Sequence, residues 1–289
     1  MARVKSMKRK NKITNTFIYI ALSILSVIWV IPIFLILYLS FSPLTSEAVL
    51  IKFPALNELT FIHYLNLFDT SRSDYLLWFK NTLIVALVTM VVNTFFIMAV
   101  AYTMSRLKFK GRKTLMLINL ILGMFPGFMS MIAVYNLLNL VNLTKSLVGL
   151  TLCYTMCSGM GFYVAKGFFD TISKSLDEAA RIDGATNAEI FFKIILPLSK
   201  PIIVYTLVTS FMGPWMDFIF CKVILREATT QYTIALGMNQ WLSATGGYRG
   251  DFFVDFFAGS VVISIPIMAV FLSTQKYYVA GVTGGAVKG

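Results

Sequence analysis

The segment EAARIDGATNAEIFFKIILPLSKP, residues Glu178–Pro201, is a polar, charge-mixed stretch that lies between two long apolar runs. Its pattern predicts two short helices joined by a tight turn outside the bilayer. Gly184 follows the first helical pattern, where a left-handed residue commonly ends a helix. Pro197 is predicted to end the second helix, and Pro201 to begin the next apolar one.

Two pairs of residues have the spacing of capping boxes, in which side chains satisfy the free N–H groups of a helix start. They are Ser175 with Glu178, and Thr186 with Glu189. The first helix also presents a small apolar face beside charged residues, so it resembles a knob that fits a groove on a soluble partner. The face comprises Leu176, Ala179, Ala180 and Ile182, beside Asp177, Glu178, Arg181 and Asp183.

Composition indicates an integral membrane protein. The chain has 289 residues, of which 57% are apolar and 13% charged, whereas soluble domains are about 45–50% apolar and about 25% charged. The net charge of +12 does not indicate nucleic-acid binding, because the basic residues flank apolar runs. Three cysteines in apolar stretches are expected to be core residues, and the single histidine, His63 in an outer loop, argues against a histidine-based metal site.

Six runs reach the roughly 20 apolar residues that a membrane span needs. The predicted fold is therefore an all-α integral membrane protein, with one transmembrane domain over residues 1–289. The first run is too long for a signal-peptide core, so it is predicted to stay in the membrane. The six runs are Phe17–Leu39, Thr82–Met104, Leu115–Leu138, Leu147–Phe169, Ile202–Val223 and Phe256–Tyr277.

The distribution of basic residues predicts the orientation. Eighteen of the 25 Lys and Arg residues fall on the side that holds both termini, and seven fall on the other. Because basic loops stay inside, residues 1–16, the loop 170–201 and the tail 278–289 are predicted to be cytoplasmic.

The central segment also resembles a known family. Its pattern is similar to the EAA loop of the membrane subunits of bacterial ABC importers, with the type I architecture. The resemblance implies that a coupling helix in this loop docks on a separate ATPase homodimer, which binds ATP and Mg²⁺, while this chain binds no cofactor. It also implies a second, different permease subunit and an extracellular sugar-binding protein. The pattern is carried by Glu178, Ala179, Ala180, Gly184, Ile194, Leu196 and Pro197, and the implied coupling residues are Glu178, Ala179, Ala180, Arg181, Asp183, Gly184 and Ala185.

Two further segments are similar to the maltose/maltodextrin (MalG-like) branch of these importers. The outer loop 240–248 implies contact of Gln240, Trp241 and Tyr248 with the binding protein, although a flexible hairpin loop explains it equally well. The tail 284–289 implies an ATPase interface, formed by Gly285, Val287 and Lys288.

Polar groups at membrane depth are costly and therefore candidates for function. Asp217 follows Gly213, Pro214 and Trp215 in the fifth run, where glycine and proline are expected to break the helix. A carboxylate accepts sugar hydroxyls and an aromatic ring stacks on sugar C–H faces. The alternative is that Asp217 lies at the outer interface beside Lys222. Asn119 and Tyr154 are further candidates for the pathway, or else form hydrogen bonds between helices.

The sequence thus favours a sugar permease of the bacterial cytoplasmic membrane, with maltose or maltodextrins as the predicted substrate. Another oligosaccharide or glycerol phosphate stays open, although no Lys or Arg lies deep in a predicted span, which favours a neutral substrate. A self-contained secondary carrier would need more carboxylates than Asp217 in the membrane. No cluster of His, Ser and carboxylate residues supports a membrane-embedded enzyme, and no P-loop sequence is present.

Overall fold

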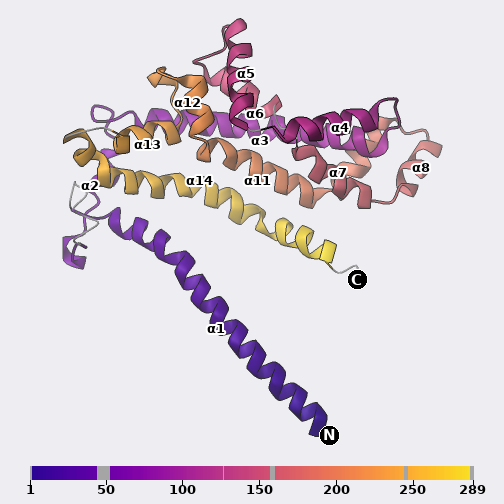
Figure 1. Ribbon diagram of the computed structural model, residues 1–289, viewed down its shortest axis with the longest axis horizontal. Helices are drawn as coiled ribbons and strands as arrows, with labels where there is room; N and C mark the ends of the chain where they lie inside the picture. Colours follow the sequence, from indigo (N-terminus) through magenta and orange to yellow (C-terminus); the bar gives the residue numbers. More distant parts are fainter. Residues whose placement is uncertain (1, 44–52, 126, 157–159, 244–246, 287–289) are drawn as a thin grey trace. The chain divides into compact units, whose positions relative to one another are not determined.

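The computed structural model describes residues 2–43, 53–125, 127–156, 160–243 and 247–286. Every regular element within these ranges is helical (Figure 1). The chain divides into two compact units, one of Met1–Arg72 with Trp241–Val262, and one of Ser73–Gln240 with Ile263–Gly289.

Four helical stretches are long and apolar enough to cross a membrane, and two bent helix pairs raise this number to as many as six. The four correspond to the first, second, fourth and sixth predicted spans. They are Thr14–Leu39 within α1 (Ala2–Leu39), α3 (Tyr75–Arg106), Leu147–Thr171 with α6 (Leu147–Met156) and α7 (Gly161–Thr171), and Phe252–Tyr277 within α14 (Gly247–Ala286).

The third predicted span is not one straight helix. Its two halves, α4 (Arg112–Gly123) and α5 (Gly127–Leu140), meet at 105°. The sequence has a proline between them, and proline disfavours helical backbone at the residue before it. The apolar run therefore predicts the length of this segment but not its bend.

The fifth predicted span breaks later than expected. Helix α11 (Lys200–Met216) continues through Pro214 and ends at Asp217, whose backbone is extended with φ −86° and ψ 103°. Helix α12 (Ile219–Leu225) follows at once. A proline removes the hydrogen bond to the preceding turn without always ending the helix, and the break comes where Asp217 caps the next helix.

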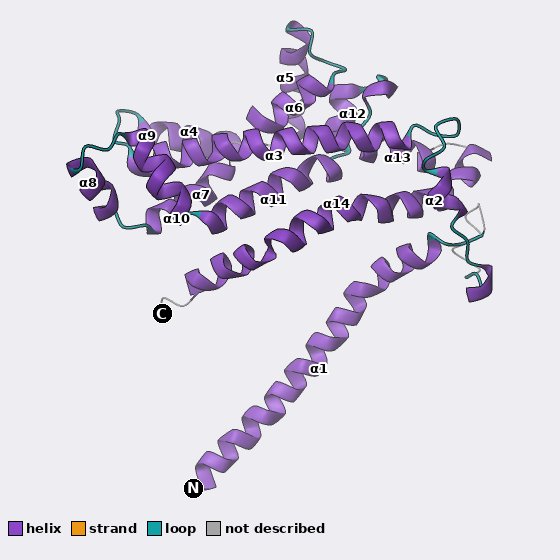
Figure 2. Ribbon diagram, turned by 180° about the vertical axis from the view of Figure 1, so that it is seen from behind, coloured by secondary structure: helices purple, strands orange, loops and turns teal. Residues whose placement is uncertain are grey.

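Helix α3 is the centre of the second unit and packs against α11, α7 and α6. Figure 2 shows α11 lying along α3. The buried residues of α3 recur every three or four positions from Tyr75 to Arg106, which is one face of a helix. Asn93 on this face donates to Ser210 Oγ of α11 at 3.0 Å. The opposite face, with Val91 and Phe95 exposed, is also apolar, as expected for a helix that faces lipid.

The N-terminal half of α3 also holds the segment that follows α12. The Asn81 side-chain amide donates to the carbonyl groups of Thr230 at 3.1 Å and Tyr232 at 3.0 Å. Thr82 Oγ1 accepts the N–H of Ile234 at 2.7 Å. Side chains rather than a sheet therefore satisfy this irregular backbone. The remaining short elements are η2 (Leu56–Glu58), α9 (Asn187–Glu189), η3 (Ile190–Ile195), α10 (Leu196–Leu198), η4 (Thr229–Gln231) and α13 (Ile234–Ser243).

In the first unit, the segment after α1 is organised by His63, which lies in α2 (Ile62–Asn66) and is 1% exposed. Its Nδ1 lies 2.6 Å from Asp255 Oδ1 and its Nε2 lies 2.9 Å from Ser42 O. Arg72 forms an ion pair with the other oxygen of Asp255 at 3.2 Å. His63 is thus a buried residue that joins this loop to α14, rather than a residue of an open outer loop.

Candidate functional site

The polar segment forms helix α8 (Ser175–Ile182), which Gly184 ends as predicted. Gly184 has φ +83°, and its N–H donates to Arg181 O at 3.1 Å. The N–H of Ala185 donates to Ala180 O at 2.9 Å. These two bonds form a Schellman motif, which satisfies carbonyl groups at the helix end. Since a Cβ is strained at this φ, glycine fixes the direction of the chain after α8.

The second predicted capping box is confirmed. The N–H of Thr186 donates to Glu189 Oε2 at 3.0 Å, and the N–H of Glu189 donates to Thr186 Oγ1 at 3.3 Å. Hydrogen bonds from Lys193 and Thr186 lower the pKa of the Glu189 carboxyl to about 2. The cap therefore stays charged at neutral pH.

The first predicted capping box is wrong. The N-cap of α8 is Lys174, which already has helical backbone dihedrals and makes no side-chain cap. Ser175 therefore lies inside the first turn, where it is not placed to accept from Glu178, since capping requires an extended N-cap backbone. Its hydroxyl is paired with Ser173 Oγ at 2.7 Å.

Pro197 does not end the second helix, which runs on to Leu198 before an 85° bend into α11. Proline has no N–H to donate to the carbonyl group four residues earlier. Residues Ile190–Ile195 accordingly form a π-helix, in which the N–H of Leu196 donates to Phe191 O. The proline shifts the hydrogen-bond pattern before it, and the chain turns at Ser199, between the end of α10 and the start of α11 at Lys200.

Most of the predicted coupling residues lie on the outward side of α8 and its turn. An apolar ridge runs along it, with Leu176 42% and Ile182 86% exposed. Of the predicted coupling residues only Ala180 is buried, and Asp177, a charged residue of the same helix, is buried with it. Residues three apart share a helix face, so these two form the inward side. The exposed residues are Glu178, Ala179, Arg181, Asp183 and Gly184, and Ala185 is half-buried.

Arg106 was not among the predicted site residues and was counted only among the basic residues of the inner side. Arg106 ends α3 and is buried. Its Nη2 donates to Phe169 O and Ile172 O, both at 2.8 Å, and its Nη1 lies 3.4 Å from Asp177 Oδ2. The spacing of Asp177 and Ala180 could have indicated an inward-facing carboxylate. Nothing local to Arg106 indicates its burial.

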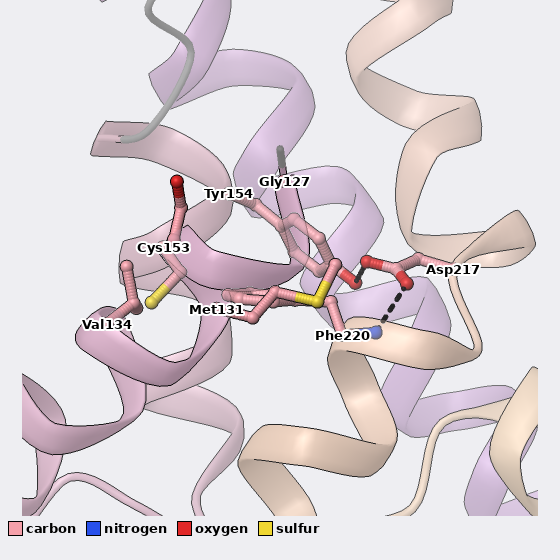
Figure 3. Close-up of a pocket in the computed structure, with 8 residues that line it drawn as sticks. Gly127, Met131, Val134, Cys153, Tyr154, Asp217 and Phe220 are labelled. Atoms are coloured by element: carbon pink, nitrogen blue, oxygen red, sulfur yellow. Dashed lines mark hydrogen bonds between the residues drawn. The ribbon is translucent and has the colours of Figure 1, made fainter. Parts of the chain in front are cut away.

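A second site is a cavity of about 320 Å³ within the second unit (Figure 3). Asp217 lies at its edge, in the break between α11 and α12. Its Oδ2 accepts from Tyr154 OH at 2.9 Å, and its Oδ1 accepts from the N–H of Phe220 at 3.0 Å. Each carboxylate oxygen can accept a further hydrogen bond. The lining residues are Gly127, Ser130, Met131, Val134, Cys153, Tyr154, Asp217 and Phe220.

The structure brings Tyr154 and Asp217 together but separates the other two predicted pathway residues from them. Trp215 is 4% exposed and packs between Phe79 and Phe211, at ring-centroid distances of 5.2 and 5.9 Å. Asn119 lines a different cavity, of about 920 Å³, which also lies in the second unit. Trp215 is therefore a packing residue beside the break, because the helix places it on the buried side of α11.

Of the predicted outer loop 240–248, residues 244–246 lie outside the described residues, and the residues on either side of them are helical. Gln240 and Trp241 belong to α13, and Tyr248 lies in the first turn of α14. Trp241 is 0% exposed, and its ring stacks on Phe252 at 5.3 Å and 15°. Stacking buries its large apolar area. Trp241 is therefore a buried residue and not the predicted contact with a binding protein.

The tail is more helical than expected. Helix α14 includes Gly285 and ends at Ala286, because an existing helix gains one hydrogen bond for each residue added. Val287 and Lys288 lie outside the described residues. Among those described, no three His, Cys, Asp or Glu residues are placed to hold a metal ion.

Comparison with known proteins places this architecture in a family. Residues 96–283 match the binding-protein-dependent transport system inner membrane component. The chain is 36% identical over 288 residues to the galactooligosaccharides transport system permease protein GanQ of Bacillus subtilis, covering 98% of this chain and 99% of that protein. It is 34% identical over 273 residues to the maltodextrin transport system permease protein MdxG of the same organism, covering 94% and 95%.

A solved structure has the same fold. The crystal structure of a bacterial ABC transporter involved in the import of the acidic polysaccharide alginate matches with a TM-score of 0.75 at 21% identity, covering 93% of this chain and 98% of that one. The all-α, type I importer architecture expected from the sequence is thereby confirmed. This chain belongs to the family of binding-protein-dependent transport system inner membrane components, and is a permease subunit rather than an enzyme.

Proposed function

We propose that this chain is a permease subunit of an ATP-driven importer that takes up a neutral oligosaccharide of the maltodextrin class. The observation that carries the proposal is helix α8, whose C-terminal end is capped and whose apolar ridge is left open, with Ile182 86% exposed. An exposed apolar ridge with a polar rim is typical of an interaction site. The chain that carries it is similar over nearly its whole length to oligosaccharide permeases.

Helix α8 is proposed to dock on a separate ATPase homodimer, which binds ATP and Mg²⁺. ATP-driven closure of that dimer would displace α8, and the spans packed on it would then alternate access to the cavity. A second, different permease subunit completes the pathway. The coupling contacts are Glu178, Ala179, Arg181, Asp183, Gly184 and Ala185, with Ala180 as the inward anchor.

The substrate is proposed to contact Asp217 and Tyr154 in the smaller cavity. The carboxylate accepts sugar hydroxyls, and the rings of Tyr154 and Phe220, 5.9 Å apart, offer apolar faces. None of the described residues that line this cavity is Lys or Arg, which favours a neutral sugar over an anionic one. Asn119 is proposed as a polar group further along the route, and Trp215 as packing that holds the break at Asp217.

The chain is proposed to lie in the bacterial cytoplasmic membrane, surrounded by lipid, with both termini and α8 in the cytoplasm. This orientation rests on the basic residues that flank the spans. On the outer side, Gln240 and Tyr248 stay proposed contacts for the extracellular binding protein. On the inner side, Gly285, Val287 and Lys288 stay a proposed ATPase interface.

The test is transport by the purified complex in proteoliposomes, with the binding protein present and labelled maltotriose or glycerol 3-phosphate as solute. The expected result is uptake of maltotriose that requires ATP on the ATPase side, with no uptake of glycerol 3-phosphate. Uptake of glycerol 3-phosphate alone, or uptake driven by an ion gradient without ATP, would overturn the proposal.

A second candidate substrate is a galactooligosaccharide. The observation that favours it is the 36% identity to GanQ over 98% of this chain. Both sugar classes are neutral and fit the same cavity chemistry, so competition decides between them. A tenfold excess of galactotriose that abolishes maltotriose uptake, while maltotriose leaves galactotriose uptake intact, would favour this candidate.

A further inference from the structure

The last turn of α3 makes hydrogen bonds or ion pairs to three places in residues 170–201, which we call the coupling segment. Ser105 Oγ donates to Asp170 Oδ1 of α7 at 2.6 Å. Tyr102 OH donates to Asn187 O, five residues beyond the end of α8, at 3.1 Å. Arg106 lies 3.4 Å from Asp177, in the first turn of α8. Because Tyr102 and Arg106 are four residues apart, they share one face of α3. One helix turn therefore contacts the coupling segment at the start of α8 and again beyond its end.

The guanidinium group of Arg106 is firmly held on its α7 side. Its side chain is 1% exposed, and Nη2 bonds two carbonyl groups at the C-terminal end of α7. That end carries the negative end of the helix dipole and has unsatisfied carbonyl groups, so a buried cation there is stabilised. Arg106 thus joins α3 and the end of α7 through hydrogen bonds that do not involve α8.

The α8 side of the same group is loose. The 3.4 Å separation from Asp177 is about 0.5 Å longer than a charge-assisted hydrogen bond. Within the described part of the chain, Asp177 Oδ1, Arg106 Nε and Arg106 Nη1 have no hydrogen-bond partner although they are buried. Unsatisfied buried charge is costly, so a shift of α8 that brings the Asp177 carboxylate within hydrogen-bond distance of Nη1 or Nε is favourable. Arg106 therefore has tight hydrogen bonds to the end of α7 and a longer contact to Asp177 of α8 that can shorten.

We propose that Arg106 is a positioning residue that passes displacement of α8 on to α3 and α7, through a charge pair with Asp177 that tightens when α8 is pushed inward. This inference rests on the proposed docking function of α8. Tyr102 supplies a second contact, because its hydroxyl bonds Asn187 O beyond the end of α8. With these two contacts, at the start of α8 and beyond its end, the helix is held against rotation about Asp177. The displacement of α8 is then transmitted to α3, the helix on which α11 and α7 pack.

The test uses the intact reconstituted complex and the variant Asp177→Asn, which keeps the size of the side chain and removes its charge. The matched control is Lys193→Gln, which removes an exposed ion pair of the same segment, 2.9 Å from Glu189; such pairs contribute little. Three quantities are measured: the number of ATPase subunits retained, the solute molecules imported per ATP hydrolysed, and the hydrogen exchange of residues 100–107 with and without a non-hydrolysable ATP analogue.

Asp177→Asn is expected to keep the ATPase subunits and basal hydrolysis but to import at least fivefold less solute per ATP. The analogue is expected to protect α8 in both proteins and residues 100–107 only in the wild type and the control. Arg106→Lys keeps the charge without the planar fork and is expected to fall between the two. In the double variant Arg106→Gln with Asp177→Asn, the loss is expected to equal that of Arg106→Gln alone.

Two results would overturn the inference. The first is that Asp177→Asn imports as much solute per ATP as the wild type and that its residues 100–107 are protected. This would show that the charge pair does not transmit the displacement of α8. Loss of the ATPase subunits in proportion to the loss of import would show a merely structural role. Failure of the proposed substrate is distinguishable, because the exchange measurement needs only ATPase binding and no sugar.

Discussion

Among single residues, Asp217 is the proposed centre of the sugar site, and it receives a hydrogen bond from Tyr154 at 2.9 Å. Asp217→Asn removes the charge, and Tyr154→Phe removes the donor. Each is expected to raise the sugar concentration for half-maximal uptake by about tenfold to a hundredfold, since a hydrogen bond to a charged group contributes about 1.5–3 kcal/mol. The matched control is Thr209→Val on α11, whose hydroxyl bonds only carbonyl groups of its own helix. Unchanged uptake in both site variants would place the substrate elsewhere.

A second residue-scale prediction concerns Gly237, which lies against the ring of Trp78. A Cβ at this position would lie 2.0 Å from Trp78 Cδ2, and Trp78 is 3% exposed, so the ring has little room to move. Gly237→Ala is expected to lower the stability of the protein in detergent by about 1–3 kcal/mol, as overpacking does. Gly167→Ala, with nothing within 4 Å, is expected to be neutral or stabilising. Equal melting temperatures of the two variants would contradict the packing described.

At the scale of elements, the turn after α8 depends on the backbone of Gly184 at φ +83°. Gly184→Val is expected to cost about 1–2 kcal/mol at this turn and to tilt α8, so that ATPase subunits are lost or sugar no longer stimulates hydrolysis. Gly184→Asn is the matched control, because asparagine tolerates left-handed backbone better than other residues. Normal sugar-stimulated hydrolysis in Gly184→Val would be incompatible with a rigid turn.

Some features of these elements could be predicted from the sequence and others could not. Gly184 and the Thr186–Glu189 box follow local rules of backbone and side-chain geometry, so both were predictable. The bend in the third span lies at a proline, but Pro214 and Pro197 lie inside helices, so a proline alone does not predict whether the helix breaks there. The pairing of Tyr154 with Asp217, 63 residues apart, and of Arg106 with Asp177 has no local signature. The polar character of Tyr154 and Asp217 in apolar runs was enough to predict them as site residues, but not to predict that they contact each other.

At the scale of the whole molecule, the proposed orientation places residues 107–111 inside and residues 67–74 outside. Ser71→Cys and Lys110→Cys lie in these exposed loops. In right-side-out vesicles, a membrane-impermeant maleimide is expected to label only Ser71→Cys, and in inside-out vesicles only Lys110→Cys. The unsubstituted chain controls for its native thiols, of which Cys153 and Cys221 are buried. The reverse labelling pattern would invert the topology and move α8 away from cytoplasmic ATP.

The central claim is that a separate ATPase drives this permease through α8. The most direct measurement is native mass spectrometry of the tagged chain, purified in mild detergent from its own cells, as wild type and as Gly184→Val. The account predicts one copy of this chain with one different permease subunit and two ATPase copies in the wild type, and fewer or inactive ATPase copies in the variant. Recovery of this chain alone, still able to import sugar on an ion gradient in vesicles, would contradict the account.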